Sequence, residues 1–412
     1  MRGQKNAIKA FAVLSALLCA VAVFGQDTEK SEPRSEEESR LTYRAKGGGK
    51  YVRKADGSFS RILTGGVEAW HLDAKLEAQE GIYKSDPSEI RFYGGTTFRD
   101  SVRQLFADTL IYYENSREAF AIGNVRVSEN GRTMLADSVR YQKNLSLLEA
   151  YGSVTVVDDS LNSSIHGTEA VFNDSTGYGL IFGEPVLKKE DDEGSIITIT
   201  CMDTIEVMRE EKITRLWKSV VMTKDSLTTK SERALYDDTV ETLTLTGSPE
   251  IQYVISNTRE DAPSILTTDC NTYGDTIRVF LHERMVTGAL VIGDATSTSI
   301  STDSTGVLFD RSVIESAEMK LDMDDDFISI VSAEGTAQSY YHRNYAETNE
   351  IFVNTATGDT LTFYFDKGEI SSMEITGYGG GLGKGKYYNY EECDIPAEPD
   401  SAAIGENVYS EP

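Results

Sequence analysis

Several side chains that often do chemistry occur in this sequence, but their spacing assembles no catalytic or metal-binding pattern. Residues 321–328, LDMDDDFI, bring four carboxylates together as a calcium-binding loop does. Such a loop needs a glycine at its sixth position, where Phe327 stands. The stretch 379–386, GGGLGKGK, imitates a phosphate-binding loop, but Tyr387 follows where Ser or Thr is required. We therefore expect a solvated acidic turn and a glycine-rich terminator at these two places.

Histidine and serine add no catalytic arrangement. The four histidines, His71, His166, His282 and His342, are scattered, and we interpret them as surface residues rather than metal ligands. No G-x-S-x-G nucleophile elbow occurs, and carboxylates are too numerous for any pair to stand out. We expect no enzymatic activity, no metal and no cofactor.

The net charge restricts the partners. The chain has 412 residues and a formal charge of −27. Nucleic acid is excluded as an expected partner, because phosphate backbones attract basic surfaces. An anionic amphiphile would have to be held chiefly by apolar contact.

The strongest signal is a repeat of about 29 residues. Small and apolar residues precede a glycine, as in AFAIGNVRV and LEAYGSVTV. An aromatic residue lies eleven positions before each glycine. The repeated glycines are Gly94, Gly123, Gly152, Gly183 and Gly247, and the aromatic positions are Tyr83, Tyr112, Tyr141, Phe172 and Tyr236. Repeats of this length indicate stacked supersecondary units that share one core.

Each repeat has the period of β-strands. Residues 148–156 alternate apolar and polar side chains, and clusters of Asn, Asp, Ser and Gly separate such segments. We predict about two strands per repeat, an all-β fold, and at each glycine either a bend of the strand or a close backbone approach. The residues expected to face the interior are Ala121, Val125, Val127, Leu148, Ala150, Val154, Val156, Ile181, Leu243, Leu245 and Ile251. Alternation alone leaves open whether this interior is an open trough or is filled by side chains.

Composition divides the chain into segments. Basic residues followed by an apolar stretch predict a secretory signal peptide at the start. Charged ends with few large apolar residues predict disorder. The expected segments are a signal peptide at 1–25, a charged flexible linker at 26–58, repeats at 59–255, a second β segment with 42-residue repeats at 256–380, and a glycine-rich then acidic disordered tail at 381–412. Lipidation of Cys19 and the disulfide state of Cys201, Cys270 and Cys393 stay open.

The repeat resembles that of the OstA-like lipopolysaccharide-transport family. The similar phrase is A-D-x-[LV]-x-Y followed by L-x-A-x-G-x-V-x-V, best seen at 135–156 and 106–127. The resemblance implies a β-taco: a V-shaped β-jellyroll of stacked antiparallel strand pairs, here as one or two stacked segments. It further implies a periplasmic location, with association to the outer membrane left open, and end-to-end pairing with other β-taco domains or with itself.

Under that resemblance the interior residues become lipid-groove candidates. The function implied is a periplasmic carrier or bridge that holds the acyl chains of lipopolysaccharide or a similar glycolipid during transport to the outer membrane. A structural β-solenoid scaffold or adhesion module with a filled core is the alternative. A polysaccharide-modifying β-helix enzyme is the less favoured third reading.

Overall fold

The computed structural model describes residues 40–129, 131–190, 194–258, 265–282, 285–324, 327–345, 350–366, 369–377 and 382–389. Within these ranges the chain consists of antiparallel β-strands joined by turns, with one short 3-10 turn, η2 (Lys143–Leu145), and no α-helix. The predicted all-β class is therefore confirmed. No helix in the described ranges has the length and apolarity needed to cross a membrane. The expected signal peptide lies outside the described residues.

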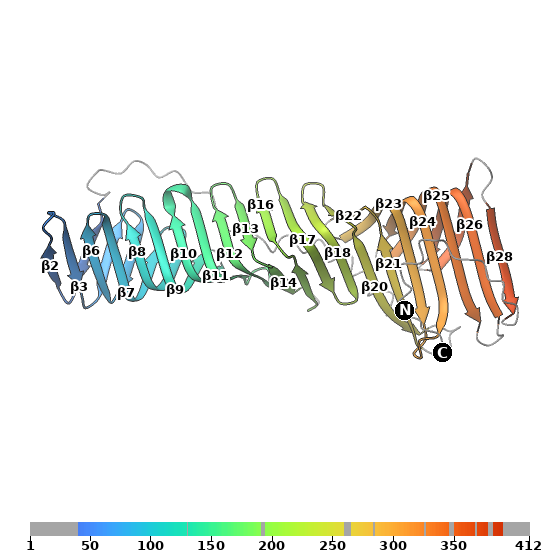
Figure 1. Cartoon of the computed structure of the whole chain (residues 1–412), viewed down its shortest axis with the longest axis horizontal. Helices are drawn as coiled ribbons and strands as arrows, with labels where there is room; N and C mark the ends of the chain where they lie inside the picture. Colours follow the sequence, from blue (N-terminus) through green and yellow to red (C-terminus); the bar gives the residue numbers. More distant parts are fainter. Residues whose placement is uncertain are drawn as a thin grey trace. The chain divides into compact units, whose positions relative to one another are not determined.

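The described chain divides into two compact units, residues 40–218 (the first unit) and 219–389 (the second unit). Figure 1 shows successive strands within each unit lying side by side. The strands of the first unit are β1 (Thr42–Ala45), β2 (Gly49–Arg53), β3 (Phe59–Leu63), β4 (Val67–His71), β5 (Ala74–Ala78), β6 (Glu80–Ser85), β7 (Ser88–Arg99), β8 (Gln104–Tyr113), β9 (Glu118–Glu129), β10 (Arg132–Gln142), β11 (Leu147–Asp158), β12 (Ser163–Asn173), β13 (Tyr178–Phe182), β14 (Val186–Glu190), β15 (Ile196–Thr200), β16 (Thr204–Met208) and β17 (Ile213–Lys224), which contains the unit boundary.

The second unit is built from longer strands. Its strands are β18 (Leu227–Asp237), β19 (Thr242–Thr246), β20 (Glu250–Thr258), β21 (Ile265–Tyr273), β22 (Thr276–His282), β23 (Met285–Thr302), β24 (Leu308–Asp324), β25 (Phe327–Tyr345), β26 (Glu350–Asp366), β27 (Glu369–Thr376) and β28 (Leu382–Asn389). Strands β23 to β26 pair antiparallel in chain order over most of their length. Val313, Tyr340, Ile351 and Val353 form a buried cluster in this unit.

Each repeat bends at a corner where two consecutive residues adopt positive φ. Gly152 has φ +76° and Ser153 has φ +47°. The β10–β11 ladder shifts its register at the same place, between Leu135 and Ser138. The same paired positive φ angles occur at Gly94–Gly95, Gly123–Asn124, Gly183–Glu184, Lys218–Ser219, Gly247–Ser248, Gly293–Asp294 and Gly335–Thr336. The repeated glycine therefore marks a bulge that turns the strand, as its spacing predicted.

The aspartate of the A-D phrase explains why the corner residue must be small. A Cβ atom built on Gly152 would lie 2.2 Å from Oδ2 of Asp137, and one on Gly123 would lie 2.5 Å from Oδ2 of Asp108. Asn124 donates a hydrogen bond from Nδ2 to the same Asp108 oxygen at 2.8 Å. Each aspartate thus packs over the corner glycine of the following strand, fifteen residues later.

The corners divide the first unit into two arms. The first arm contains β2, β3, β6, β13 and β16 together with the halves of β7 to β12 that pair with them, such as Tyr112 opposite Ala119. The second arm contains β1, β4, β5, β14 and β15 with the other halves, such as Leu105 opposite Val127. This two-armed sheet is the arrangement expected of a β-taco.

The structure corrects two predicted boundaries. Strands β1 and β2 lie inside 26–58, because alternating residues such as Tyr43 and Tyr51 pair with later strands despite the high charge around them. Strand β28 lies inside the predicted tail 381–412, paired with β26. The boundary between the two compact units falls at Lys218, within β17. The segments 26–39 and 390–412 lie outside the described residues.

Candidate binding groove and its open end

The interior candidates from the sequence face inward and are shielded from water. All are at most 5% exposed except Val156, which is half-buried. The candidates Ala121, Val125, Val127, Leu148, Ala150, Val154, Val156 and Ile181 belong to the first unit, and Leu243, Leu245 and Ile251 belong to the second. Among the aromatic repeat positions, Tyr112, Tyr141, Phe172 and Tyr236 are buried and Tyr83 is half-buried.

Large and small side chains alternate across the strands of the first arm. Leu110 lies opposite Ala121, which in turn lies opposite Val139. Val139 lies opposite Ala150 on the next strand. The facing arm contributes Phe98, Leu105, Val125, Met134 and Val154, each at most 2% exposed. An open trough would leave such walls exposed, so the interior of the first unit is closed to water in this structure.

A polar seam closes the side opposite the corners, where the tips of the two arms meet. The seam residues are Asp73, Asp100, Arg103 and Glu129 from the second arm and Arg117, Lys143 and Asp174 from the first. Between the arms, Arg117 binds Asp73 at 3.2 Å, and Lys143 binds Asp100 at 2.8 Å and also Asp73. His71 and Tyr112 share a further cross-arm hydrogen bond of 2.6 Å. Side-chain contacts, rather than backbone pairing, therefore link the arms along this side.

Arg103 is the most buried cation of the seam. Its side chain is 2% exposed, donates from Nε to Glu129 at 2.9 Å, and binds Asp174 through Nη2. It also lies 4.7 Å from the ring centroid of Tyr141 on the first arm. Arg132 and Asp158 form the same pair at 2.7 Å, one repeat later and more exposed. Charged seam contacts thus follow the repeat.

Burial and ion pairing shift the pKa values of two seam carboxylates in opposite directions. Burial raises the pKa of Asp174 to about 6, and the neighbouring Glu129 carboxylate adds to this shift while Arg103 opposes it. For Asp73, burial acts upward, but the hydrogen bond and charge of Lys143 outweigh it and lower the pKa. Burial raises the pKa of Tyr112 to about 12. One buried guanidinium therefore serves two carboxylates, and the pKa of one of them, Asp174, is raised.

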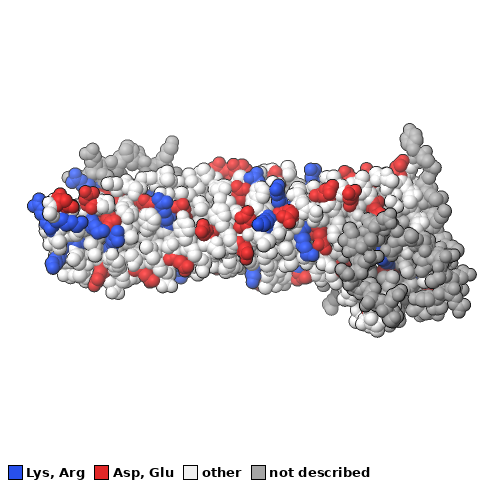
Figure 2. All heavy atoms as spheres, in the orientation of Figure 1, with Lys and Arg blue, Asp and Glu red and all other residues white. Residues whose placement is uncertain are grey.

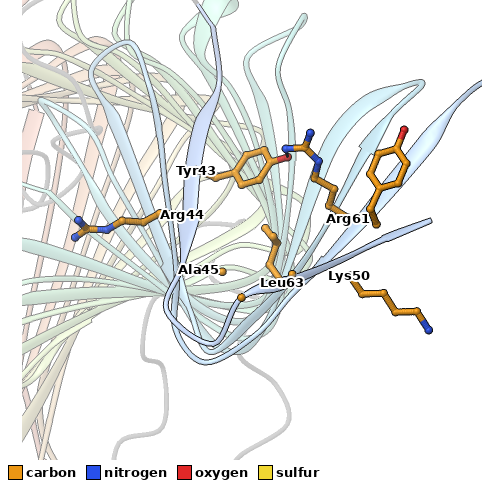
Figure 3. Close-up of a pocket in the computed structure, with 9 residues that line it drawn as sticks. Tyr43, Arg44, Ala45, Lys50, Arg61 and Leu63 are labelled. Carbon is orange, nitrogen blue, oxygen red and sulfur yellow. Dashed lines mark hydrogen bonds between the residues drawn. The ribbon is translucent and has the colours of Figure 1, made fainter. Parts of the chain in front are cut away.

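Among the residues that the structure describes, nothing covers the N-terminal end of the first unit, which we call its open end. A cavity of about 420 Å³ lies between β1 and β2–β3, with Tyr43, Tyr51, Arg61 and Leu63 among its walls. Figure 3 shows Leu63 and Ala45 between the two sides, the Arg61 guanidinium beside the Tyr43 ring, and Lys50 and Arg44 extending away. Strand β1 pairs with β4, and β2 pairs with β3, so among the described strands each has one free edge.

Charge is also concentrated at this end. Residues 40–66 contain seven Lys and Arg residues and a single Asp, in a chain whose total charge is −27. Figure 2 shows Lys and Arg side chains gathered over the end of the first unit that β2 and β3 form. The open end is therefore locally basic in an acidic protein.

The other residues singled out in the sequence are the acidic stretch, the cysteines and the histidines. Within the described ranges no group of three or more His, Cys, Asp or Glu side chains could hold a metal ion. Asp322, in the acidic stretch, forms an ion pair with Lys320 at 2.9 Å. Cys201 and Cys270 are both free thiols. His71 is buried, which corrects its interpretation as a surface residue, because its ring fills the seam beside Tyr112.

Sequence reasoning missed the seam and the open end. A charged residue in a turn, such as Asp174 or Lys143, looks solvated when the opposite arm is unknown. The repeat held a usable signal, since Arg103 and Glu129 recur as Arg132 and Asp158 at the 29-residue spacing. Tyr43 and Arg61 lay in or beside the stretch predicted to be a linker.

Comparisons with known proteins give a limited match. No protein-family model matches the chain, and no curated protein matches it. Among solved structures, the chain is similar to LptH from Pseudomonas aeruginosa, described as the LptA-homologous periplasmic component of the conserved lipopolysaccharide transport device. That match has 18% identity and a TM-score of 0.23, and it covers 34% of this chain and 82% of LptH.

Proposed function

We propose that this protein is a carrier or bridge for a glycolipid such as lipopolysaccharide, with the acyl chains held between the two arms. The observation that carries the proposal is the continuous inward row of apolar side chains, from Phe92 through Leu110 and Ala121 to Ala150, enclosed by one folded sheet. Burial of apolar surface would supply the affinity, at about 25 cal/mol per Å².

The seam provides a route for lipid to enter. Acyl chains can occupy the interior only if the arms separate, because the interior is closed to water here. The corners hold the arms together through the continuous backbone, whereas the seam holds them through side chains such as Lys143 and Arg103. Separation at the seam therefore breaks no strand pairing, and it would let the interior widen around a ligand.

The small side chains of the interior suit this role. Ala121, Ala150 and Ala170 lie in one cross-strand row of the first arm, with Val139 between the first two. Small residues leave room for acyl chains once the arms part, whereas bulky ones would fill the widened space again. In this account the protein is not an enzyme, needs no cofactor, and works in the periplasm. The free edges of β1 and β2 are available for pairing with another β-taco domain or a second copy.

Lipid extraction tests the proposal. The full chain would be expressed in a Gram-negative bacterium, purified under mild conditions, and extracted with solvent for mass spectrometry. We expect about one lipid A species per protein, and its loss in Val154→Asp, which places a charge at a fully buried inward position. Thr155→Asp, on the outward side of the same strand, is the matched control and should retain the lipid.

A structural scaffold with a filled core is the second candidate. The observation that favours it is the near-zero exposure of the inward side chains, including Leu148 and Ala150. A lipid-free protein that is folded and takes up no added lipid would support the scaffold over the carrier.

A further inference from the structure

We propose that the open N-terminal end of the first unit is a binding site for the phosphate group of a phosphorylated amphiphile, with Arg61 as its main cation. This inference rests on the proposed function and adds to it a place and a head-group chemistry. It combines the cavity between β1 and β2–β3 with the basic side chains gathered there.

Arg61 is held in place by aromatic side chains. Its guanidinium donates from Nη1 to the Tyr43 hydroxyl at 2.9 Å. It lies 5.3 Å from the ring centroid of Phe59, 5.8 Å from that of Tyr43 and 6.0 Å from that of Tyr51. These rings fix the guanidinium without neutralising it, which leaves most of its five N–H donors for a ligand.

The carboxylate at this end pairs with only some of the cations. Glu68 binds Arg44 at 2.6 Å and lies 3.6 Å from Lys46. Among the described residues, no carboxylate lies within ion-pair distance of Arg61 or Lys50. A guanidinium with free donors matches a phosphate group, which it can bind through two parallel hydrogen bonds.

The floor of the cavity is apolar. Leu63 is buried, and with Ala45 it lies between the two sides of the cavity in Figure 3, beside the Arg61 rim. The volume of about 420 Å³ is in the range of small-molecule sites. A phosphate on Arg61 would place an attached acyl chain over Leu63, pointing toward the interior of the two arms. The site therefore fits an amphiphile that carries both a phosphate head and an acyl chain. It fits a free phosphate or an uncharged acyl chain less well.

The test measures binding of lysophosphatidate to the full chain below its critical micelle concentration, by titration calorimetry. Monoacylglycerol with the same acyl chain and inorganic phosphate are the two comparison ligands. Arg61→Gln should weaken lysophosphatidate binding about tenfold or more, since hydrogen bonds to charged groups are strong. It should leave monoacylglycerol binding unchanged. Arg53→Gln, an equal charge change on β2 outside the cavity lining, is the matched control and should change binding less than about twofold.

Each other outcome overturns the inference in a recognisable way. Equal binding of lysophosphatidate and monoacylglycerol, unaffected by Arg61→Gln, would remove the phosphate site while leaving the acyl-binding proposal intact. Inorganic phosphate bound as tightly as lysophosphatidate would show a simple anion site. A change in self-association without a change in lipid binding, measured by sedimentation, would assign the surface to a protein partner. Failure of all amphiphiles to bind the wild-type chain would contradict the proposed function as well.

Discussion

Arg103 on the second arm binds Asp174 on the first, although 71 residues separate them in the sequence. The same guanidinium binds Glu129 at 2.9 Å, and both of these side chains are nearly inaccessible to water. This contact makes the side opposite the corners a closed polar seam rather than an open mouth. The strength of the Arg103 contacts therefore affects both the stability of the fold and the ease with which the two arms can separate.

Removing the buried guanidinium should destabilise the first unit strongly. Arg103→Met leaves the Glu129 and Asp174 carboxylates buried without their cation, and we expect a loss of about 3–5 kcal/mol in the free energy of unfolding. Arg132→Met removes the equivalent but more exposed cation, so about 1–2 kcal/mol is expected. Urea unfolding followed by tryptophan fluorescence measures both, because Trp70 and Trp217 lie in the first unit. Equal losses in the two variants would show that burial at the seam is unimportant.

The raised pKa of Asp174 predicts a pH dependence. Its folded-state pKa of about 6 lies above the ordinary value of 3.8, so the folded protein holds this proton more tightly. The resulting stabilisation is fully present below the ordinary value and is lost as the pH rises through 6.

Between pH 7.5 and 5, wild-type stability should therefore rise relative to Asp174→Asn by about 1.4 kcal/mol, because pH 5 lies one unit below the folded-state pKa. The comparison with Asn cancels the titration of all other groups common to both proteins. Urea unfolding at several pH values provides the measurement. Parallel stability curves for the two proteins would contradict the assignment.

The corner glycines should resist substitution for two separable reasons. Gly152→Ala meets both the positive φ of +76° and the Asp137 carboxylate, so we expect about 2–3 kcal/mol of destabilisation. Gly131→Ala has a similar φ of +81° but nothing within 4 Å of the new Cβ, so about 1 kcal/mol is expected. Thermal and urea unfolding would compare them. A Gly131 variant as unstable as the Gly152 variant would mean that backbone conformation alone sets the requirement.

The sequence predicted the repeat because its cause is local. A bulge needs glycine at positions such as Gly123 and Gly152, and strand alternation follows from one buried face. The second corner residue was not predictable, since Asn124 and Ser153 adopt positive φ only because the sheet bends there. The cross-arm pairing of Lys143 was equally hidden, because ion pairs between turns depend on how far the two arms close.

The first strands, β1 and β2, were also not predicted from the sequence. Composition makes residues around Lys50 look like a charged linker, yet β2 pairs with β3 along its whole length. Short edge strands are commonly charged. A high density of charged residues therefore does not distinguish a flexible linker from an edge strand. The basic open end was hidden in this way, although its residues are adjacent in the sequence.

The most direct test of the central claim places a photo-reactive residue inside the first unit. The probe residue replaces Val156, the half-buried inward candidate, and for comparison Thr155, whose side chain lies on the other face of β11 and contacts His166. Cells producing each full-length variant are irradiated, and the protein is examined for covalently attached lipid by mass spectrometry. A lipid A adduct at 156 and none at 155 is the result that the carrier account predicts. Equal labelling at both positions, or no adduct at 156 in a folded protein, would contradict it.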